Sequence, residues 1–159
     1  MADILIAINE KTKTELSTKL KQLLQDSYAL YIQTHNYFWN VSRLQNPVLH
    51  MMFEYQYTEL ATAIGNIAKH MRELDIPVSW TYKTDSMLTS MNPVENASTP
   101  FEMINLLTQG HEQVLNILRS ILKIAKKNNY YTTISLISYR IRIHEKMIWV
   151  LKGAHIKAL

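Results

Sequence analysis

Hydrophobic residues recur at three- and four-residue steps along most of the chain, the spacing that gathers them on one face of an α-helix. This pattern predicts four long helices, over roughly residues 10–40, 47–74, 99–127 and 130–153. The side chains expected to face the core are Leu16, Leu20, Leu23, Leu24, Tyr31, Leu49, Met52, Phe53, Leu60, Met103, Leu107, Val114, Leu118, Ile121, Ile134, Ile137, Ile141, Ile148 and Leu151.

Boundary signals support this division. Asn46-Pro47 offers an N-cap and a first-turn proline for the second helix, which is expected to end near Ile76-Pro77. Thr99-Pro100-Phe101-Glu102 combines a threonine cap, a proline at N1 and a glutamate at N3, which together predict a capping box at the start of the third helix. Asn128-Asn129 predicts a tight turn before the fourth helix, which is expected to end at Gly153.

The long connection over residues 75–98 lies between the second and third helices, with a short extra helix expected at 84–91. Two helical pairs joined by one long crossover describe an all-α, four-helix bundle. We expect one domain over residues 1–159, a length that allows a substantial core.

Composition narrows the possible functions. The 159 residues include no cysteine, which excludes disulfides, thiolate metal sites and thiol catalysis. No basic leader precedes the short apolar run at 4–8, and no run is long enough to span a membrane, so a cytoplasmic protein is expected. The glycosylation-like triplets at Asn40 and Asn96 are then chance matches. A formal net charge of +4 permits contact with nucleic acid without defining a basic patch.

The second predicted helix contains two residues that look misplaced. Residues 58–74 read TELATAIGNIAKHMREL, in which Gly65 sits mid-helix at a cost of about 1 kcal/mol relative to alanine. Lys69, four residues on, is expected at the shoulder of the apolar stripe, where an unpaired ammonium would be costly to bury. The helical pattern alone does not explain why Gly65 and Lys69 occur at these two positions.

Metal-binding patterns are sparse. Four-helix bundles of this shape often hold two irons between Glu-x-x-His pairs, and no glutamate in this chain has a histidine three residues later. The neighbours His111-Glu112 and His144-Glu145 point about 100° apart on a helix, so each pair is interpreted as ordinary polar and salt-bridged positions. His50 and Glu54 share one helix face and could supply a nitrogen and an oxygen to a metal, or form a surface ion pair.

Several stretches resemble the Dps family, the DNA-protecting mini-ferritins of starved cells. They are INEKTKTELSTKLKQLLQDSYALYIQTHNYFWNV, LHMMFEYQYTELATAIGNIAKHMREL, GHEQVLNILR and YRIRIHEKMIWVL, and the similarity covers about residues 8–152. The resemblance implies a homo-dodecameric shell of ferritin-like subunits with a short helix in the long connection. It also implies iron oxidation with peroxide, storage of ferric mineral as cargo, and often DNA binding.

The family's iron site lies between two subunits, and this sequence departs from it. The resemblance places ligands at five positions, of which only His50 and Glu54 keep a ligand side chain. The other three hold Phe38 in place of a histidine, Gly65 in place of an aspartate and Lys69 in place of a glutamate. The resemblance therefore explains the unusual pair on the second helix and predicts a vestigial ferroxidase site with no catalytic residue.

Two neighbours of this site need separate treatment. Trp39 is expected at the two-fold interface, where it packs or, with residual iron, intercepts oxidants. His35 lies within about 60° of Phe38 but one turn away, so it could replace the lost ligand only if the site shifted. An active ferroxidase using His50, Glu54 and His35 is the alternative function.

Other positions have lost acids that the resemblance implies. Met51 and Tyr55 stand where cavity-facing nucleation acids are expected, and Tyr130 and Ser135 stand where the pores carry acids, just after Lys126 and Lys127. Because Fe²⁺ uptake relies on negative potential, uptake, oxidation and nucleation are all expected to be weakened.

The sequence thus predicts a non-catalytic Dps-like shell, with DNA binding left open, no cofactor apart from iron at any residual site and no membrane partner. A signalling role, or a mixed shell with an active paralogue, is also open. DNA-binding residues are not identified, because the lysines at Lys11, Lys13, Lys19, Lys21, Lys152 and Lys157 fit a solvated helix face equally well. Between subunits, we expect Lys69 to contact Glu54 of a neighbouring copy.

Overall fold

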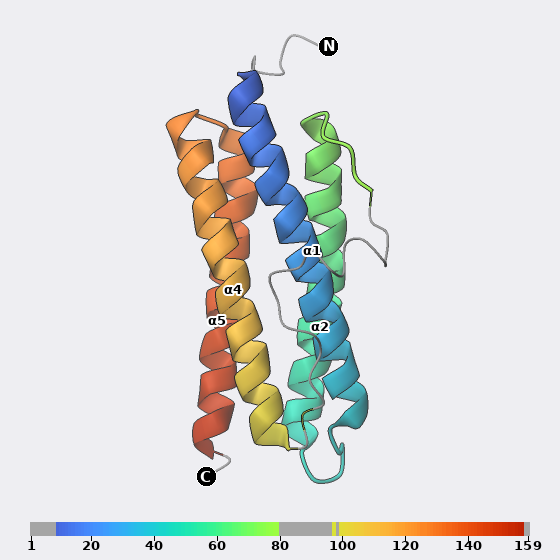
Figure 1. Ribbon diagram of the computed structural model, residues 1–159. Coiled ribbons are helices and arrows are strands. Elements are labelled where there is room, and N and C mark those ends of the chain that lie inside the picture. The colour runs from blue at the N-terminus through green and yellow to red at the C-terminus, as the bar shows by residue number, and fades with distance from the viewer. Residues whose placement is uncertain (1–8, 80–96, 98, 158–159) are drawn as a thin grey trace.

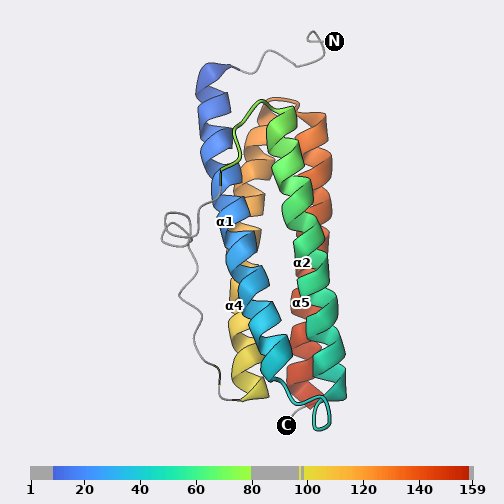
Figure 2. The same ribbon diagram turned by 90° about the vertical axis from the view of Figure 1, so that its right-hand side faces the viewer.

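Four long helices form one bundle (Figures 1 and 2) in the computed structural model, which describes residues 9–79, 97 and 99–157. They are α1 (Glu10–Asn40), α2 (Pro47–Glu73), α4 (Pro100–Lys127) and α5 (Tyr131–Lys157). Within the described residues there is no strand. The predicted all-α four-helix bundle is confirmed, whereas the extra helix expected at 84–91 lies outside the described residues.

The helices pair in the order in which they follow one another. Figure 1 shows α1 and α2 joined by a short loop at one end of the bundle, and α4 and α5 joined by a tight turn at the other end. The closest packing is within these pairs and between α1 and α4, whereas α2 and α5 approach each other over a shorter stretch. Among the helices described, none is long and apolar enough to cross a membrane.

The core follows the predicted stripes. Leu16 and Leu20 of α1, Phe53 and Leu60 of α2, and their counterparts on α4 and α5 are fully buried in one hydrophobic cluster. Four predicted core residues are only half-buried at its edge: Tyr31, Met52, Ile134 and Ile141. Each buried leucine-sized side chain contributes about 1.5–3 kcal/mol to folding, so this cluster is the main source of stability.

The α4 start forms as its sequence predicts. The Thr99 Oγ1 accepts a hydrogen bond from the Glu102 amide at 3.2 Å, and the Glu102 carboxylate accepts one from the Thr99 amide at 3.1 Å. Asn129, in the following turn, has the left-handed φ of 56° that asparagine tolerates.

Two boundary predictions need correction. Asn46 precedes α2, but its side chain makes no capping hydrogen bond to any described residue, because its backbone (φ −134°, ψ 61°) departs from the usual cap conformation. Helix α5 does not end at Gly153 but continues to Lys157. Ala154 packs against the core and the His155 ring lies 4.3 Å from the Phe101 ring, so tertiary contacts hold this last turn.

Candidate functional site

The surviving histidine of the predicted iron site lies where α1 ends and α2 begins. His50, in the first turn of α2, is half-buried, and its ring centroid lies 4.3 Å from that of Phe38 in the last turn of α1. The two rings are tilted by 40°. An apolar ring therefore covers one side of the imidazole, and Glu54, one turn further along α2, is exposed.

Gly65 and Lys69 lie further along α2, on the same side as Glu54. Both residues are exposed in the single chain, so Lys69 at the edge of the apolar stripe is not buried there. Fifteen residues of helix separate Glu54 from Lys69, which is roughly 22 Å. The two side chains can therefore meet only if a second copy of the chain brings them together.

His35 belongs to a stack of aromatic rings beside the site. Its ring lies 4.2 Å from Tyr57 and nearly parallel to it at 20°, and 4.1 Å from Trp39. Tyr57 also contacts Phe38, with centroids 5.1 Å apart. Tyr57 was missed from sequence, although its helical step from Phe53 and Leu60 could have placed it at the edge of the core. Trp39, 68% exposed, is a surface residue in the single chain.

No group of three or more histidine, aspartate or glutamate side chains within the described residues could hold a metal ion. Within the part of the chain that the structure describes, His50 and Glu54 therefore have no third ligand of these types beside them.

The other departures from the expected pattern are distributed over the subunit. On α2, Met51 and Tyr55 are exposed, by 70% and 54% respectively. Tyr130 is buried, and burial raises the pKa of its phenol. Ser135 lines a groove of about 320 Å³ that also contains Lys69, and Lys126 and Lys127 are exposed in the last turn of α4.

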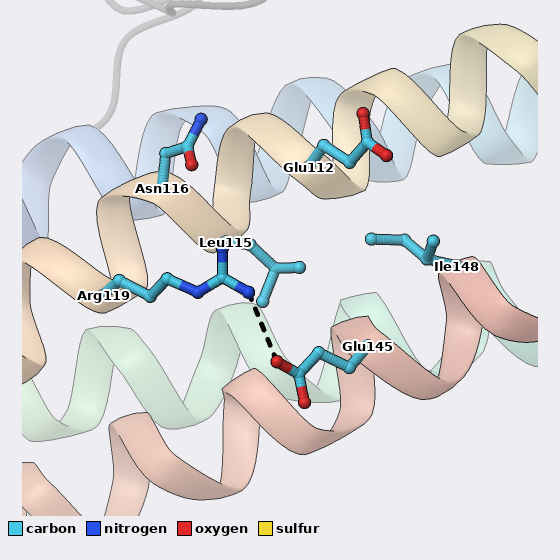
Figure 3. A pocket seen from close by; sticks show the side chains of 6 residues that line it. All are labelled: Glu112, Leu115, Asn116, Arg119, Glu145 and Ile148. Carbon is cyan, nitrogen blue, oxygen red and sulfur yellow. Dashed lines mark hydrogen bonds and ion pairs between the residues drawn. The ribbon is translucent and has the colours of Figure 1, made fainter.

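The two His-Glu neighbours place their histidines inside the bundle and their glutamates outside. Glu145 pairs with Arg119 at 3.3 Å across a groove of about 450 Å³ between α4 and α5 (Figure 3), and Glu112 pairs with Lys152 at 3.2 Å. The expected salt-bridged surface positions are therefore confirmed for the glutamates.

The histidines form a contact that sequence reasoning missed. His111 on α4 and His144 on α5 are fully buried, and their Nδ1 atoms lie 2.8 Å apart. The signal was present, because each histidine continues the buried stripe of its helix. A pairing across 33 residues cannot be read from either stripe alone.

This pair continues into a longer polar chain. The Nε2 atom of His111 lies 3.3 Å from the Gln56 side-chain oxygen, and the Nε2 atom of His144 lies 3.1 Å from Arg140. Arg140 also pairs with both carboxylate oxygens of Glu59. Burial, reinforced by Arg140, lowers the pKa of His111 to about 3, and burial with the two neighbouring groups lowers that of His144 well below its usual value.

Comparison with known proteins agrees with the fold. The family model for a ferritin-like domain matches residues 17–157. The chain is 27% identical over 134 residues to DNA protection during starvation protein 2 of Bacillus anthracis, an overlap of 84% of this chain and 92% of the relative.

Solved structures give the same result. The Dps protein of Vibrio cholerae O1 superimposes with a TM-score of 0.85 at 24% identity, covering 93% of this chain and 96% of that one. Dps from Thermosynechococcus elongatus gives 0.84 at 22% identity, covering 90% and 91%. At these sequence identities, the structural similarity shows the fold alone. The chain therefore belongs to the ferritin-like domain family, and its structural neighbours within it are Dps proteins.

Proposed function

We propose that this chain is a Dps-like shell protein that has lost ferroxidase activity and acts as a non-catalytic shell. Iron would be substrate and cargo in an active relative, so the proposal concerns whether ferrous iron can be held at the interface between subunits. Three of the five expected ligand positions carry side chains that cannot bind it: Phe38, Gly65 and Lys69.

The observation that carries this proposal is the contact between Phe38 and His50. A phenyl ring 4.3 Å from the imidazole lies where a second ligand nitrogen would be needed, and it supplies neither charge nor lone pair. Phe38 cannot be moved aside without cost, because its ring also packs against Tyr57. The surviving ligand is thus held in an aromatic environment that disfavours a dication.

The alternative is an active ferroxidase that uses His50, Glu54 and His35. Against it stands the stacking of the His35 ring between Trp39 and Tyr57, which commits the imidazole to ring contacts. Turning His35 toward His50 would break both contacts. Iron found at these three side chains would favour the alternative.

Lys69 supports the same conclusion from the side of the second subunit. If copies meet as in a Dps shell, the ammonium of Lys69 approaches Glu54 of the neighbouring copy. The ammonium then provides one positive charge where iron would have provided two or three. The Glu54 carboxylate therefore still has a positively charged partner when no metal is bound. Gly65 leaves space beside the lysine, because no described atom lies within 4 Å of the position of a Cβ added there.

The assembly itself is part of the proposal. The proposed assembly is a homo-dodecamer. DNA bound to it through phosphates would be consistent with the name of the Bacillus anthracis relative and with a formal charge of +4 on each copy. Exposed Lys126 and Lys127 are candidates for such contacts. Binding of this kind weakens steeply with salt, which gel shifts at two salt concentrations would measure. Co-assembly with an active paralogue would combine His50 and Glu54 with the paralogue's two acids, which gives four of the five expected ligands.

Reinstating the ligands tests the proposal. The triple variant Phe38→His, Gly65→Asp, Lys69→Glu should gain ferrous iron binding in anaerobic titration calorimetry, because it restores the full set of nitrogen and oxygen ligands. Lys69→Met alone should gain none, since three of the five positions still lack a nitrogen or oxygen ligand. A matched control carries Gly153→Asp, Lys123→Glu and Tyr131→His at exposed positions of α4 and α5. Binding of iron by the unaltered protein with comparable affinity would overturn the proposal.

A further inference from the structure

Five polar side chains form a continuous chain of contacts through the centre of the bundle. We call them the histidine relay: Glu59 and Gln56 of α2, His111 of α4, and Arg140 and His144 of α5. Four of the five are buried, and Arg140 is 2% exposed. Burying so many polar groups is costly unless each is hydrogen-bonded, so the order of donors and acceptors decides whether the relay stabilises the fold.

The direction of every hydrogen bond follows from Arg140, which can only donate. It donates to the Nε2 atom of His144 at 3.1 Å, so this nitrogen carries no proton. A neutral His144 then has its proton on Nδ1 and donates to the Nδ1 atom of His111 at 2.8 Å. His111 in turn has its proton on Nε2, from which it donates to the Gln56 oxygen at 3.3 Å.

These three hydrogen bonds can therefore all form only when both imidazoles are neutral. The Gln56 Nε2 and Arg140 Nε atoms have no hydrogen-bond partner among the described residues. A proton added to His144 would go to Nε2 and face the N–H of Arg140. A proton added to His111 would go to Nδ1 and face the N–H of His144. Either addition replaces a hydrogen bond with two opposed donors and places a second positive charge beside the buried guanidinium.

We propose that the histidine relay is an acid-sensitive contact between helices, which we call the latch. It holds α5 against α4 and α2 while both imidazoles are neutral, and α5 separates from them when either imidazole accepts a proton. The position of the relay suits this role. Helices α2 and α5 approach each other over a short stretch, and Glu59 with Arg140 spans the gap between them. The proposal depends on the subunit core and not on iron chemistry.

Charged groups around the relay agree with this direction. Glu59 forms an ion pair with Arg140, which compensates the charge of its carboxylate. On α1, the buried Asp26 accepts a hydrogen bond from Gln22 of its own helix. Glu112 and Glu145, next to the histidines in sequence, turn outward to Lys152 and Arg119.

The pH range follows from the lowered pKa values. The folded-state pKa of His111 is about 3 and that of His144 is well below its usual 6.5, so the unfolded chain binds more protons as the pH falls. The stabilisation is fully present above pH 6.5 and is lost progressively as the pH decreases from 6.5 toward 3. Each histidine that stays neutral in the folded chain while it is protonated in the unfolded chain changes the unfolding equilibrium constant by up to about tenfold per pH unit.

Urea unfolding of the full-length protein between pH 7.5 and 4.5, at one protein concentration, tests the latch. We expect the unfolding equilibrium constant of the unaltered protein to rise by up to about a hundredfold between pH 6 and pH 5 from these two groups. The double variant His111→Gln, His144→Gln should lose most of this dependence. Unchanged pH dependence in the double variant would overturn the proposal.

Two controls separate the relay from other histidines. His70→Gln removes a second buried imidazole, which bonds Thr133 at 2.9 Å outside the relay. His155→Gln removes a half-buried imidazole on the same helix as His144. Both single variants should retain the acid sensitivity of the unaltered protein. Loss of that sensitivity in either control would assign it to another site.

A second measurement needs no variant and remains decisive if the double variant does not fold. Hydrogen–deuterium exchange at the imidazole C2 position, followed by mass spectrometry, reports the protonation midpoint of each histidine in the intact protein. His111 and His144 should titrate well below pH 6.5, and amide exchange in α5 should accelerate over the same range after correction for intrinsic rates. Titration of both histidines near pH 6.5 would contradict the latch.

Discussion

Gly65 is an exposed glycine in the interior of α2, at the position where the Dps resemblance implies an aspartate. Glycine weakens a helix because it loses more backbone entropy on folding than other residues. Nothing in the single chain requires it there, since no described atom lies within 4 Å of where its Cβ would stand and its φ is not positive. We therefore attribute the glycine at this position either to packing of a neighbouring copy or to loss of the expected aspartate ligand.

Gly65→Ala is therefore expected to raise the free energy of unfolding of the subunit by about 0.5–1 kcal/mol. Chemical denaturation monitored by circular dichroism would measure the change. Gly153→Ala is the matched control, because that glycine is also exposed with no described atom within 4 Å, but it lies near the end of α5, where the gain should be smaller. A loss of stability in Gly65→Ala would show that another copy packs closely against this position.

For single residues, the sequence predicted which positions belong to the candidate site more reliably than it predicted the contacts of their side chains. Phe38 and His50 were singled out from spacing and resemblance, and the structure places their rings together. Tyr57 was not identified, because its contact with His35 depends on the rotamers of both side chains.

Helix boundaries show how local and tertiary effects compete at the scale of elements. Thr99 and Glu102 form the predicted reciprocal pair, because a capping box needs only residues three positions apart. Gly153 does not end α5, because the contacts of Ala154 and His155 outweigh a propensity cost of about 1 kcal/mol. The local signal thus predicted the start of α4, which depends on residues close in sequence. It failed at the end of α5, which depends on contacts with residues distant in sequence.

Thr99→Ala should lower the free energy of unfolding by about 1 kcal/mol, because it leaves the Glu102 amide without its side-chain acceptor. Asn46→Ala at the start of α2 is the matched control, since the Asn46 side chain makes no capping hydrogen bond to a described residue. Its loss should be clearly smaller, as measured by denaturant midpoints at constant slope. Equal losses in the two variants would contradict the role assigned to the capping box.

At the scale of the whole molecule, the two proposed features both depend on residues that are distant in sequence or belong to different copies. The proposed Glu54–Lys69 contact needs a second copy, because these residues lie about 22 Å apart on one helix. The histidine relay joins three helices, and only the folded bundle brings its members within hydrogen-bond distance. Sequence could place each residue on a helix face but could not pair faces across the chain.

A charge exchange tests the contact between copies. Lys69→Glu should weaken assembly, because it brings two carboxylates together across the interface, and Glu54→Lys, Lys69→Glu should restore it. Sedimentation velocity across a range of protein concentrations would measure both changes. Lys146→Glu, which alters an exposed lysine of α5, controls for net charge. Failure of the double exchange to recover assembly would argue against the pairing.

The central claim is that this ferritin-like shell no longer oxidises iron at the interface between its subunits. The most direct measurement is the rate at which the purified, assembled protein oxidises ferrous iron in the presence of peroxide, compared with a protein-free control in the same buffer. The account predicts no acceleration over the control, because Phe38, Gly65 and Lys69 leave too few ligands. Rapid, saturable oxidation, with iron bound between His50 and Glu54, would contradict it.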